Sequence, residues 1–308
     1  MKKTHSFIIA ILLTFLMLLV SGIPALAASS GYCISKVTSA NGETLATMKL
    51  EGKTLTVDQN SEAKYPYFNN RLQSYITPTS NKYLYNLRIL AGLGNNLGSY
   101  TSWMLWEPVY SGKVDEIIWN ESDGVSKYVI TVTRDSSNRI SSLKYLEYWK
   151  YSSEPSAPRT EIETYKYSNN KLSEIQSYYK YENSEYDSAL KLAYSGDRIT
   201  KISSASTDEY GTTTEVIDVS YNDQGLVRRA SLNKKQSSQI MVNDAEKYES
   251  TYSYNSDGYL TRWQGYLRDM KIRYDTNGCI ARTDESITPS HGGGDTWVET
   301  YVFAYAKY

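Results

Sequence analysis

One short motif recurs along most of this chain: an aromatic residue, then a turn of Asn, Asp, Ser and Gly, then an aliphatic residue. The clearest copies span residues 221–227, 254–260 and 274–280, and each has a glycine at its fifth position. Two copies are one residue shorter (167–172 and 194–199), and two are weaker relatives (134–140 and 119–125). A unit that recurs this often constrains the architecture of the whole chain.

The chemistry of the motif is that of a β-hairpin. Asp, Asn and Ser open a tight turn by bonding nearby backbone, and glycine (or Asn138 in the copy at 134–140) accepts the left-handed conformation that closes it. The flanking runs are rich in β-formers, and consecutive hairpins pair as an antiparallel meander. The sequence therefore predicts an all-β fold, a large twisted sheet of successive hairpins that can close into a barrel-like shell.

The aliphatic residues after several turns are three positions apart. Leu172 and Ile175 show this spacing, as do Ile199 and Ile202. In a regular strand such residues face opposite sides. Either both faces of the sheet are partly covered, or β-bulges are common.

The motif resembles the YD repeat of the Rhs-type bacterial cell-surface and toxin-shell proteins. It is also similar to small exported bacterial proteins of unknown function with YD-like hairpins, for which a porin-like β fold is described. The resemblance covers roughly residues 113–308, although only Tyr274 is followed by Asp and the two short copies lack the closing glycine. It implies a fold and a surface location, and it carries over no catalytic residue.

The first 27 residues read as a secretory signal. Lys2 and Lys3 precede an apolar run at 7–20, and Ala25-Leu26-Ala27 supplies a cleavage site. The run is short for a membrane helix, so we expect cleavage near Ala27, no membrane span in the mature chain, and an extracytoplasmic location.

Between the signal and the repeats, residues 28–112 predict short strands and a helix. Strands are expected at 44–50 and 53–57 about a turn at Gly52, and a short helix at 81–93 capped by Asn81. The apolar stretch 103–110 is expected to plug one end of the sheet. A boundary near Gly112 would separate this part from the repeat domain at 113–308.

Composition narrows the function. The chain holds 30 Tyr against 4 Phe, and the many hydroxyls predict half-exposed sheet surface where water can bond them. A formal net charge of −1 favours no nucleic acid partner. The only histidines are His5, in the signal, and His291, so two-histidine metal sites are excluded and we predict neither metal nor cofactor.

Two further groups of residues carry little chemistry. Cys33 and Cys279 either pair in an oxidising compartment or remain free thiols, and the low cysteine count favours free thiols. Ser290, His291 and Asp295 are too close in sequence for a catalytic triad, so we interpret that stretch as a hairpin loop.

The aromatic residues of the last strand are the candidate binding surface. Trp297, Tyr301, Phe303 and Tyr305 share one face with Glu299. With Trp263, the residues Trp297, Tyr301 and Tyr305 are the predicted ligand-binding set, since flat aromatic faces stack on sugar rings. The alternative is that such aromatics only hold the sheet together as cross-strand pairs.

The acids suggest no catalytic pair. Glycoside hydrolysis needs two carboxyl groups at a defined separation. No pair stands out among the abundant acids, of which we note Glu161, Glu163, Glu174, Asp218 and Glu299. We therefore predict that the chain is not an enzyme.

These observations predict an exported, non-enzymatic binding or scaffold protein of the cell surface or cell wall, whose partner is a polysaccharide or a cell-surface protein. The alternative is an outer-membrane β-barrel of porin-like kind. A lipid-facing wall must stay apolar from strand to strand, whereas Glu215 shares a face with Ile217 and Val219.

Overall fold

The computed structural model describes residues 32–60, 82–92, 107–120, 126–149, 158–181, 184–208, 211–238, 246–289 and 295–307. The predicted signal at 1–27 lies outside these residues. So do Ser290 and His291, residues 103–106 of the apolar stretch at 103–110, and the turn of the weak motif copy at 119–125.

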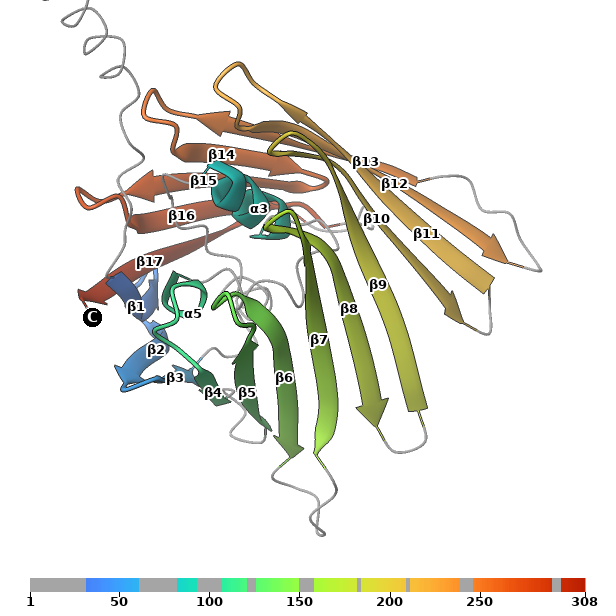
Figure 1. The fold of residues 1–308 in the computed structure, drawn as a ribbon. Helices are drawn as coiled ribbons and strands as arrows, with labels where there is room; N and C mark the ends of the chain where they lie inside the picture. Colours follow the sequence, from blue (N-terminus) through green and yellow to red (C-terminus); the bar gives the residue numbers. More distant parts are fainter. Residues whose placement is uncertain are drawn as a thin grey trace, which may run out of the picture.

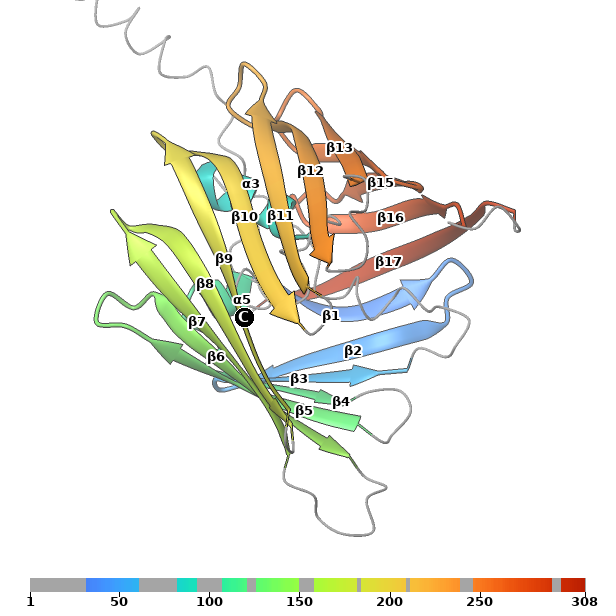
Figure 2. The ribbon, with the colours of Figure 1, turned by 90° about the vertical axis from the view of Figure 1, so that its right-hand side faces the viewer.

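The described strands form one sheet that closes on itself (Figures 1 and 2). Neighbours in the chain pair in sequence order, and β1 pairs with both β2 and β17, which closes the ring. The predicted all-β meander is confirmed, and the barrel is closed. The seventeen strands of the described residues are β1 (Tyr32–Ser39), β2 (Thr44–Glu51), β3 (Thr54–Gln59), β4 (Glu116–Asn120), β5 (Ser126–Arg134), β6 (Ile140–Trp149), β7 (Arg159–Ser168), β8 (Lys171–Tyr181), β9 (Ser184–Ser195), β10 (Arg198–Asp208), β11 (Gly211–Tyr221), β12 (Val227–Ser238), β13 (Glu246–Tyr254), β14 (Leu260–Gly265), β15 (Arg268–Tyr274), β16 (Ile280–Ile287) and β17 (Trp297–Lys307).

An odd number of strands cannot close with antiparallel pairs alone. The parallel pair that the ring requires is β3–β4, whereas the other pairs are antiparallel. Two helices among the described residues, α3 (Lys82–Gly92) and α5 (Glu107–Tyr110), lie between these strands in the chain. The crossover that contains them returns the chain to the end where β3 began, as a parallel pair demands.

The barrel has two different ends. The turns of the motif copies from 134–140 onward, with the β2–β3 turn, lie at the end we call the turn end, where β1 also begins and β17 finishes. The other connections, among them β6–β7, β12–β13 and β16–β17, lie at the opposite end, which we call the loop end.

The motif turns have the predicted chemistry. In the turn before β16, the Asp275 carboxylate accepts hydrogen bonds from the backbone N–H of Asn277 (2.8 Å) and of Cys279 (2.9 Å). Gly278 has a φ of 76°, and Asn138 takes the same left-handed conformation in its own turn at 61°. The side chain that opens the turn and the residue that closes it both act as expected.

β-Bulges explain the three-residue spacing of the aliphatics. The pairing register shifts just after the turn, for example between Lys166 and Tyr167 of β7 opposite β8. Leu172 and Ile175 are consequently both buried on the same face. Of the two alternatives that the sequence left open, the bulge is correct here.

The inner face of the barrel is apolar and the outer face is polar. On β15, Met270 and Ile272 are buried, whereas the alternating Lys271 and Arg273 are exposed. The same alternation along the other strands fills the barrel with aliphatic and aromatic side chains that pack into one cluster. The core is therefore the barrel's own interior.

The N-terminal part has the predicted elements. β2 and β3 flank a turn at Gly52 (φ 60°), and α3 matches the predicted helix closely. β1, β2 and β3 belong to the same sheet as the repeat strands. Of the predicted plug at 103–110, the structure describes 107–110, which form α5 at the turn end.

The tyrosine of each motif copy hydrogen-bonds the previous copy. Its hydroxyl donates to the backbone carbonyl of the aliphatic residue one repeat earlier, which links neighbouring hairpins. Tyr167 donates to Ile140 (2.8 Å), Tyr194 to Leu172 (2.5 Å), Tyr221 to Ile199 (2.8 Å), Tyr254 to Val227 (2.6 Å) and Tyr274 to Leu260 (2.9 Å). The expectation that these hydroxyls need water is wrong for these tyrosines, because the carbonyls beside the bulges are their partners.

Helix α3 lies inside the barrel at the turn end (Figures 1 and 2). The backbone N–H of Leu172 donates to the Tyr83 hydroxyl (2.9 Å) and that of Leu260 to the Tyr85 hydroxyl (2.9 Å). The N–H of Val227 donates to Asn86 Oδ1 (3.0 Å). These N–H groups follow motif turns on three separate strands, so α3 links widely separated hairpins at this end.

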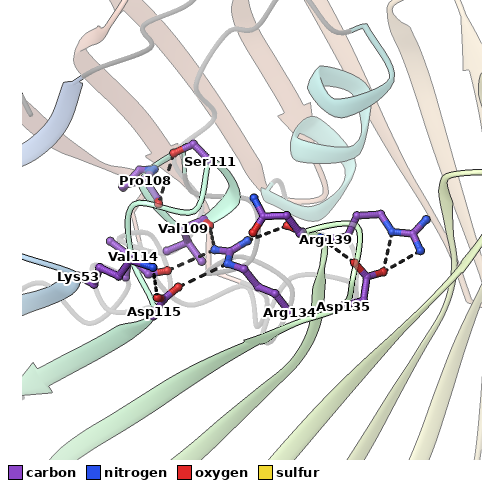
Figure 3. A network of polar contacts seen from close by, with 10 residues as sticks. Lys53, Pro108, Val109, Ser111, Val114, Asp115, Arg134, Asp135 and Arg139 are labelled. Atoms are coloured by element: carbon purple, nitrogen blue, oxygen red, sulfur yellow. Dashed lines mark hydrogen bonds and ion pairs between the residues drawn. The ribbon is translucent and has the colours of Figure 1, made fainter.

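Arg134 holds α5 against the β5–β6 hairpin (Figure 3). It occupies the position that tyrosine takes in the stronger copies, and its guanidinium donates to the carbonyl oxygens of Val109 and Val114 (3.3 Å) and to Asp115. Asp115 also accepts from Lys53 Nζ at 2.5 Å. Arg134 thus replaces the tyrosine link with an ionic one.

Among the described residues, no helix is both long enough and apolar enough to cross a membrane.

Candidate functional site

The inner face changes from apolar to charged toward the loop end. Beyond the aliphatic layer, the inward positions of several strands carry carboxylates and a few cations. They are Glu147 and Glu163 with Glu161 on β6–β7, Glu215 and Lys234 on β11–β12, and Arg268, Glu285 and Glu299 on β15–β17. The polar half of the interior is the candidate site, because buried polar groups that do not serve the core commonly serve a ligand.

On the β16–β17 wall two carboxylates oppose each other. Glu285 and Glu299 are direct cross-strand partners, and both are buried. Glu299 accepts hydrogen bonds from Trp297 Nε1 (3.2 Å) and from the Tyr301 hydroxyl. Arg268 Nε lies 3.6 Å from Glu285. This wall therefore combines acids with the aromatic residues that the sequence selected.

The four predicted ligand-binding residues share the inner face but not one level of it. Trp263, Met270, Glu285 and Glu299 form a continuous row across β14–β17. Trp297 is 37 % exposed at the loop end, while Trp263 and Tyr301 are buried. Tyr305 is opposite Ile34, near the turn end. Trp297 and Tyr301 thus contact the acid pair, Trp263 lies two strands away in the same row, and Trp297 is the most accessible of the four.

A second acidic wall lies on β6 and β7. Glu163 is fully buried; its Oε2 accepts from the Tyr145 hydroxyl (3.2 Å) and from the Tyr165 hydroxyl. Glu147 accepts from the Tyr128 hydroxyl (2.8 Å) and lies 3.3 Å from Arg159 Nη1. Burial raises the pKa of Glu163 to about 8 and that of Glu161 to about 7. These carboxyl groups take up protons near neutral pH.

The acids noted in the sequence include both outward-facing and inward-facing side chains, which the sequence alone does not distinguish. Glu174 and Asp218 face outward and form ion pairs with Lys166 (3.0 Å) and Lys201 (3.8 Å). Glu147 and Glu285 face inward and were not selected. The signal that finds them is their spacing of two and four residues from buried residues of the same strand, Thr283 for Glu285 and Leu143 for Glu147, once the bulges set which face points inward.

The cysteines are both free and buried. Burial raises the pKa of Cys33 to about 12 and that of Cys279 to about 11, so both stay protonated thiols at neutral pH. Within the part of the chain that the structure describes, no three His, Cys, Asp or Glu side chains are grouped so that they could hold a metal ion.

Comparisons with known proteins assign no family. No family model matches the chain, and no curated protein matches it. Among solved structures, a porin-like protein from Bacteroides uniformis ATCC 8492 matches 59 % of this chain and 91 % of its own, at 10 % identity and a TM-score of 0.30. A similarity this low carries no argument. The resemblance to YD-repeat proteins stays a prediction.

Proposed function

We propose that the chain is an exported, non-enzymatic binding protein of the cell surface or cell wall. Its barrel wall faces water, and its ligand contacts the inner wall at the loop end. The observation that carries the proposal is the division of polarity, with charged pairs on the outside of the strands and the apolar core inside. The secretory signal predicted at 1–27 supports the location.

The outer wall carries ion pairs in the middle of its strands. Arg262 binds Asp269 through two nitrogens, at 2.8 and 2.6 Å, across β14 and β15. Equivalent outward pairs join β7 to β8 and β10 to β11. On the lipid-facing wall of a transmembrane barrel, each charged side chain near the middle of the bilayer destabilises the protein by several kcal/mol. A wall of this composition is stable in water.

The proposed ligand is a polysaccharide that reaches the loop end. Trp297 presents an exposed indole beside Glu299, and a flat ring next to a carboxylate suits a sugar, which offers both an apolar face and hydroxyl donors. Glu285 and Arg268 extend the polar surface along the same wall.

A glycan-binding screen tests this assignment. We expect Trp297→Ala to abolish binding of the glycan that wild-type protein captures. Tyr148→Ala is the matched control, since Tyr148 is similarly exposed (42 %) but lies on the outer face of β6. Unchanged binding by folded Trp297→Ala protein, or equal loss in both variants, would contradict the site.

The second candidate function is an outer-membrane barrel of porin-like kind. The closed meander of hairpin-connected strands favours it, because closure removes the sheet edges that lipid does not tolerate. Size-exclusion chromatography with light scattering on residues 28–308 separates the two. A monodisperse species without detergent supports the water-facing barrel, whereas aggregation that detergent relieves supports the membrane barrel.

A further inference from the structure

The inner wall formed by β5–β8 holds more carboxylates than cations. Glu147, Glu161 and Glu163 face inward. Among the described residues of these strands the inward cations are Arg159, which pairs with Glu147, and Arg134, which lies at the turn end and pairs with Asp115. The lysines nearby, such as Lys144 and Lys166, are exposed on the outer face. Glu161 is half-buried and shares Arg159 with Glu147, whereas the fully buried Glu163 is left without a countercharge, which is costly when it is ionised.

Glu163 also has an unused hydrogen-bonding atom. Both tyrosine hydroxyls that contact it donate to Oε2, while Oε1 is buried and has no hydrogen-bond partner. A fully buried carboxyl oxygen in a folded protein is normally bonded. Ser177 is its cross-strand neighbour on β8, and Glu161 lies two residues away on the same face, toward the loop end.

We propose that this wall, centred on Glu161 and Glu163, binds the primary ammonium group of an organic cation, such as a polyamine or a lysine side chain, that enters from the loop end. The ammonium would donate one hydrogen bond to Glu163 Oε1 and supply the missing countercharge. The site lies on different strands from Trp297 and goes beyond the proposed glycan contact.

The surroundings suit an ammonium better than a metal ion. Calcium and magnesium require six or more oxygen ligands, whereas each ammonium N–H needs only one acceptor. Aromatic faces add to the attraction: Arg159 already lies 4.6 Å from the centre of the Tyr179 ring, so a cation at this level of the barrel contacts tyrosine.

Ligand binding at this site is expected to depend on pH, because the carboxyl groups bind protons. The groups that face it are Tyr128 from β5, Tyr145 and Glu147 from β6, Arg159 and Tyr165 from β7, and Tyr179 from β8. Glu161 and Glu163 have raised pKa values of about 7 and about 8 because of burial. An ammonium binds their ionised forms, so binding releases protons and strengthens as pH rises.

Isothermal titration of the full chain with spermidine tests the proposal. We expect binding at about pH 9 that weakens about tenfold or more at about pH 6, with a heat that depends on the ionisation enthalpy of the buffer. Glu163→Gln keeps the shape but removes the charge, and we expect it to weaken binding about tenfold. Glu249→Gln, on the outer wall beside Arg229, is the matched control and should leave the affinity unchanged.

Several outcomes would overturn the site. They are no spermidine binding across this pH range, equal affinity in Glu163→Gln, equal loss in Glu249→Gln, or calcium chloride binding in place of spermidine. Glu161→Gln is the second variant if Glu163→Gln does not fold, and it carries the same expectation. The glycan proposal fails separately, because only Trp297→Ala tests it and Glu163→Gln should leave glycan binding intact.

Discussion

The hydroxyl of Tyr254 donates a 2.6 Å hydrogen bond to the backbone carbonyl of Val227, the aliphatic residue of the preceding motif copy. The same relationship recurs from copy to copy, and it explains why the motif joins an aromatic residue to an aliphatic one. The bulge after each turn frees a carbonyl from the strand ladder, and the next tyrosine supplies its donor. The residue before the aliphatic completes the unit: Arg139 stacks on Tyr167, and Arg198 on Tyr221.

The tyrosine link is testable at one position. Tyr254→Phe keeps the ring but leaves the Val227 carbonyl without this donor, so we expect a loss of about 1–2 kcal/mol in the free energy of unfolding. Tyr266→Phe is the control, since Tyr266 is 59 % exposed, and its change should be close to zero. Urea denaturation followed by circular dichroism measures both. Equal effects in the two variants would mean that the link does not stabilise the barrel.

The closing position of the motif turn requires a left-handed residue. Gly225 has a φ of 77°, and a Cβ there would meet Arg198 Nη2 only at ordinary contact distance (3.5 Å), so the cost of a side chain comes from the backbone. We expect Gly225→Ala to lose about 1 kcal/mol of stability. Gly225→Asn should lose less, because Asn138 holds the corresponding position in another copy. Thermal melts that rank the asparagine variant below the alanine variant would contradict this reasoning.

Arg134 is the link between α5 and the β5–β6 hairpin (Figure 3). Its guanidinium reaches two carbonyls and Asp115 at once, which a lysine cannot reproduce. We expect Arg134→Ala to lose about 2–3 kcal/mol of unfolding free energy and Arg134→Lys to recover only part of it. Arg229→Ala is the comparison, because Arg229 forms an exposed pair with Glu249 and should lose less than about 1 kcal/mol. Chemical denaturation of the three variants decides the order.

The hairpins and the helix at 82–92 could be predicted because each depends on a few adjacent residues, and the spacing of the aliphatics left β-bulges as one of two alternatives. Closure could not, since it depends on β1 meeting β17, and nothing local in Tyr32 or Lys307 encodes that pairing. The parallel β3–β4 pair was also missed, because the segment between these strands gives no sign of the direction in which the chain returns.

The site was predicted in part for the same reason. Alternation along β17 correctly placed Trp297, Glu299 and Tyr301 on one face, but only closure shows that this face is the inside of a barrel. Glu285 and Glu163 belong to the candidate site because of residues on neighbouring strands. Glu285 is the cross-strand partner of Glu299, and Glu163 accepts a hydrogen bond from Tyr145 on β6. Such relationships follow from register, which the single strand does not contain.

The buried carboxyl of Glu163 makes stability depend on pH in a direction opposite to that of an ordinary ion-paired acid. Its pKa is about 8 in the folded protein, against an ordinary value of 4.5, so the folded state holds a proton that the unfolded chain has released. Between about pH 4.5 and about pH 8 the unfolded state binds fewer protons, and the free energy of unfolding therefore falls as pH rises. Glu161, with a pKa of about 7 against an ordinary 4.5, lowers the free energy of unfolding in the same direction between about pH 4.5 and about pH 7.

Glu163→Gln removes this dependence while it keeps an oxygen for the Tyr145 and Tyr165 hydroxyls. We expect the variant to match wild type within about 1 kcal/mol at about pH 5, where the wild-type carboxyl is neutral, and to be the more stable protein at about pH 9. Urea midpoints at both pH values measure the difference, and Glu249→Gln on the outer wall should show no such crossover. A constant offset between Glu163→Gln and wild type at the two pH values would mean that Glu163 is already ionised in the folded barrel, with a cation beside it.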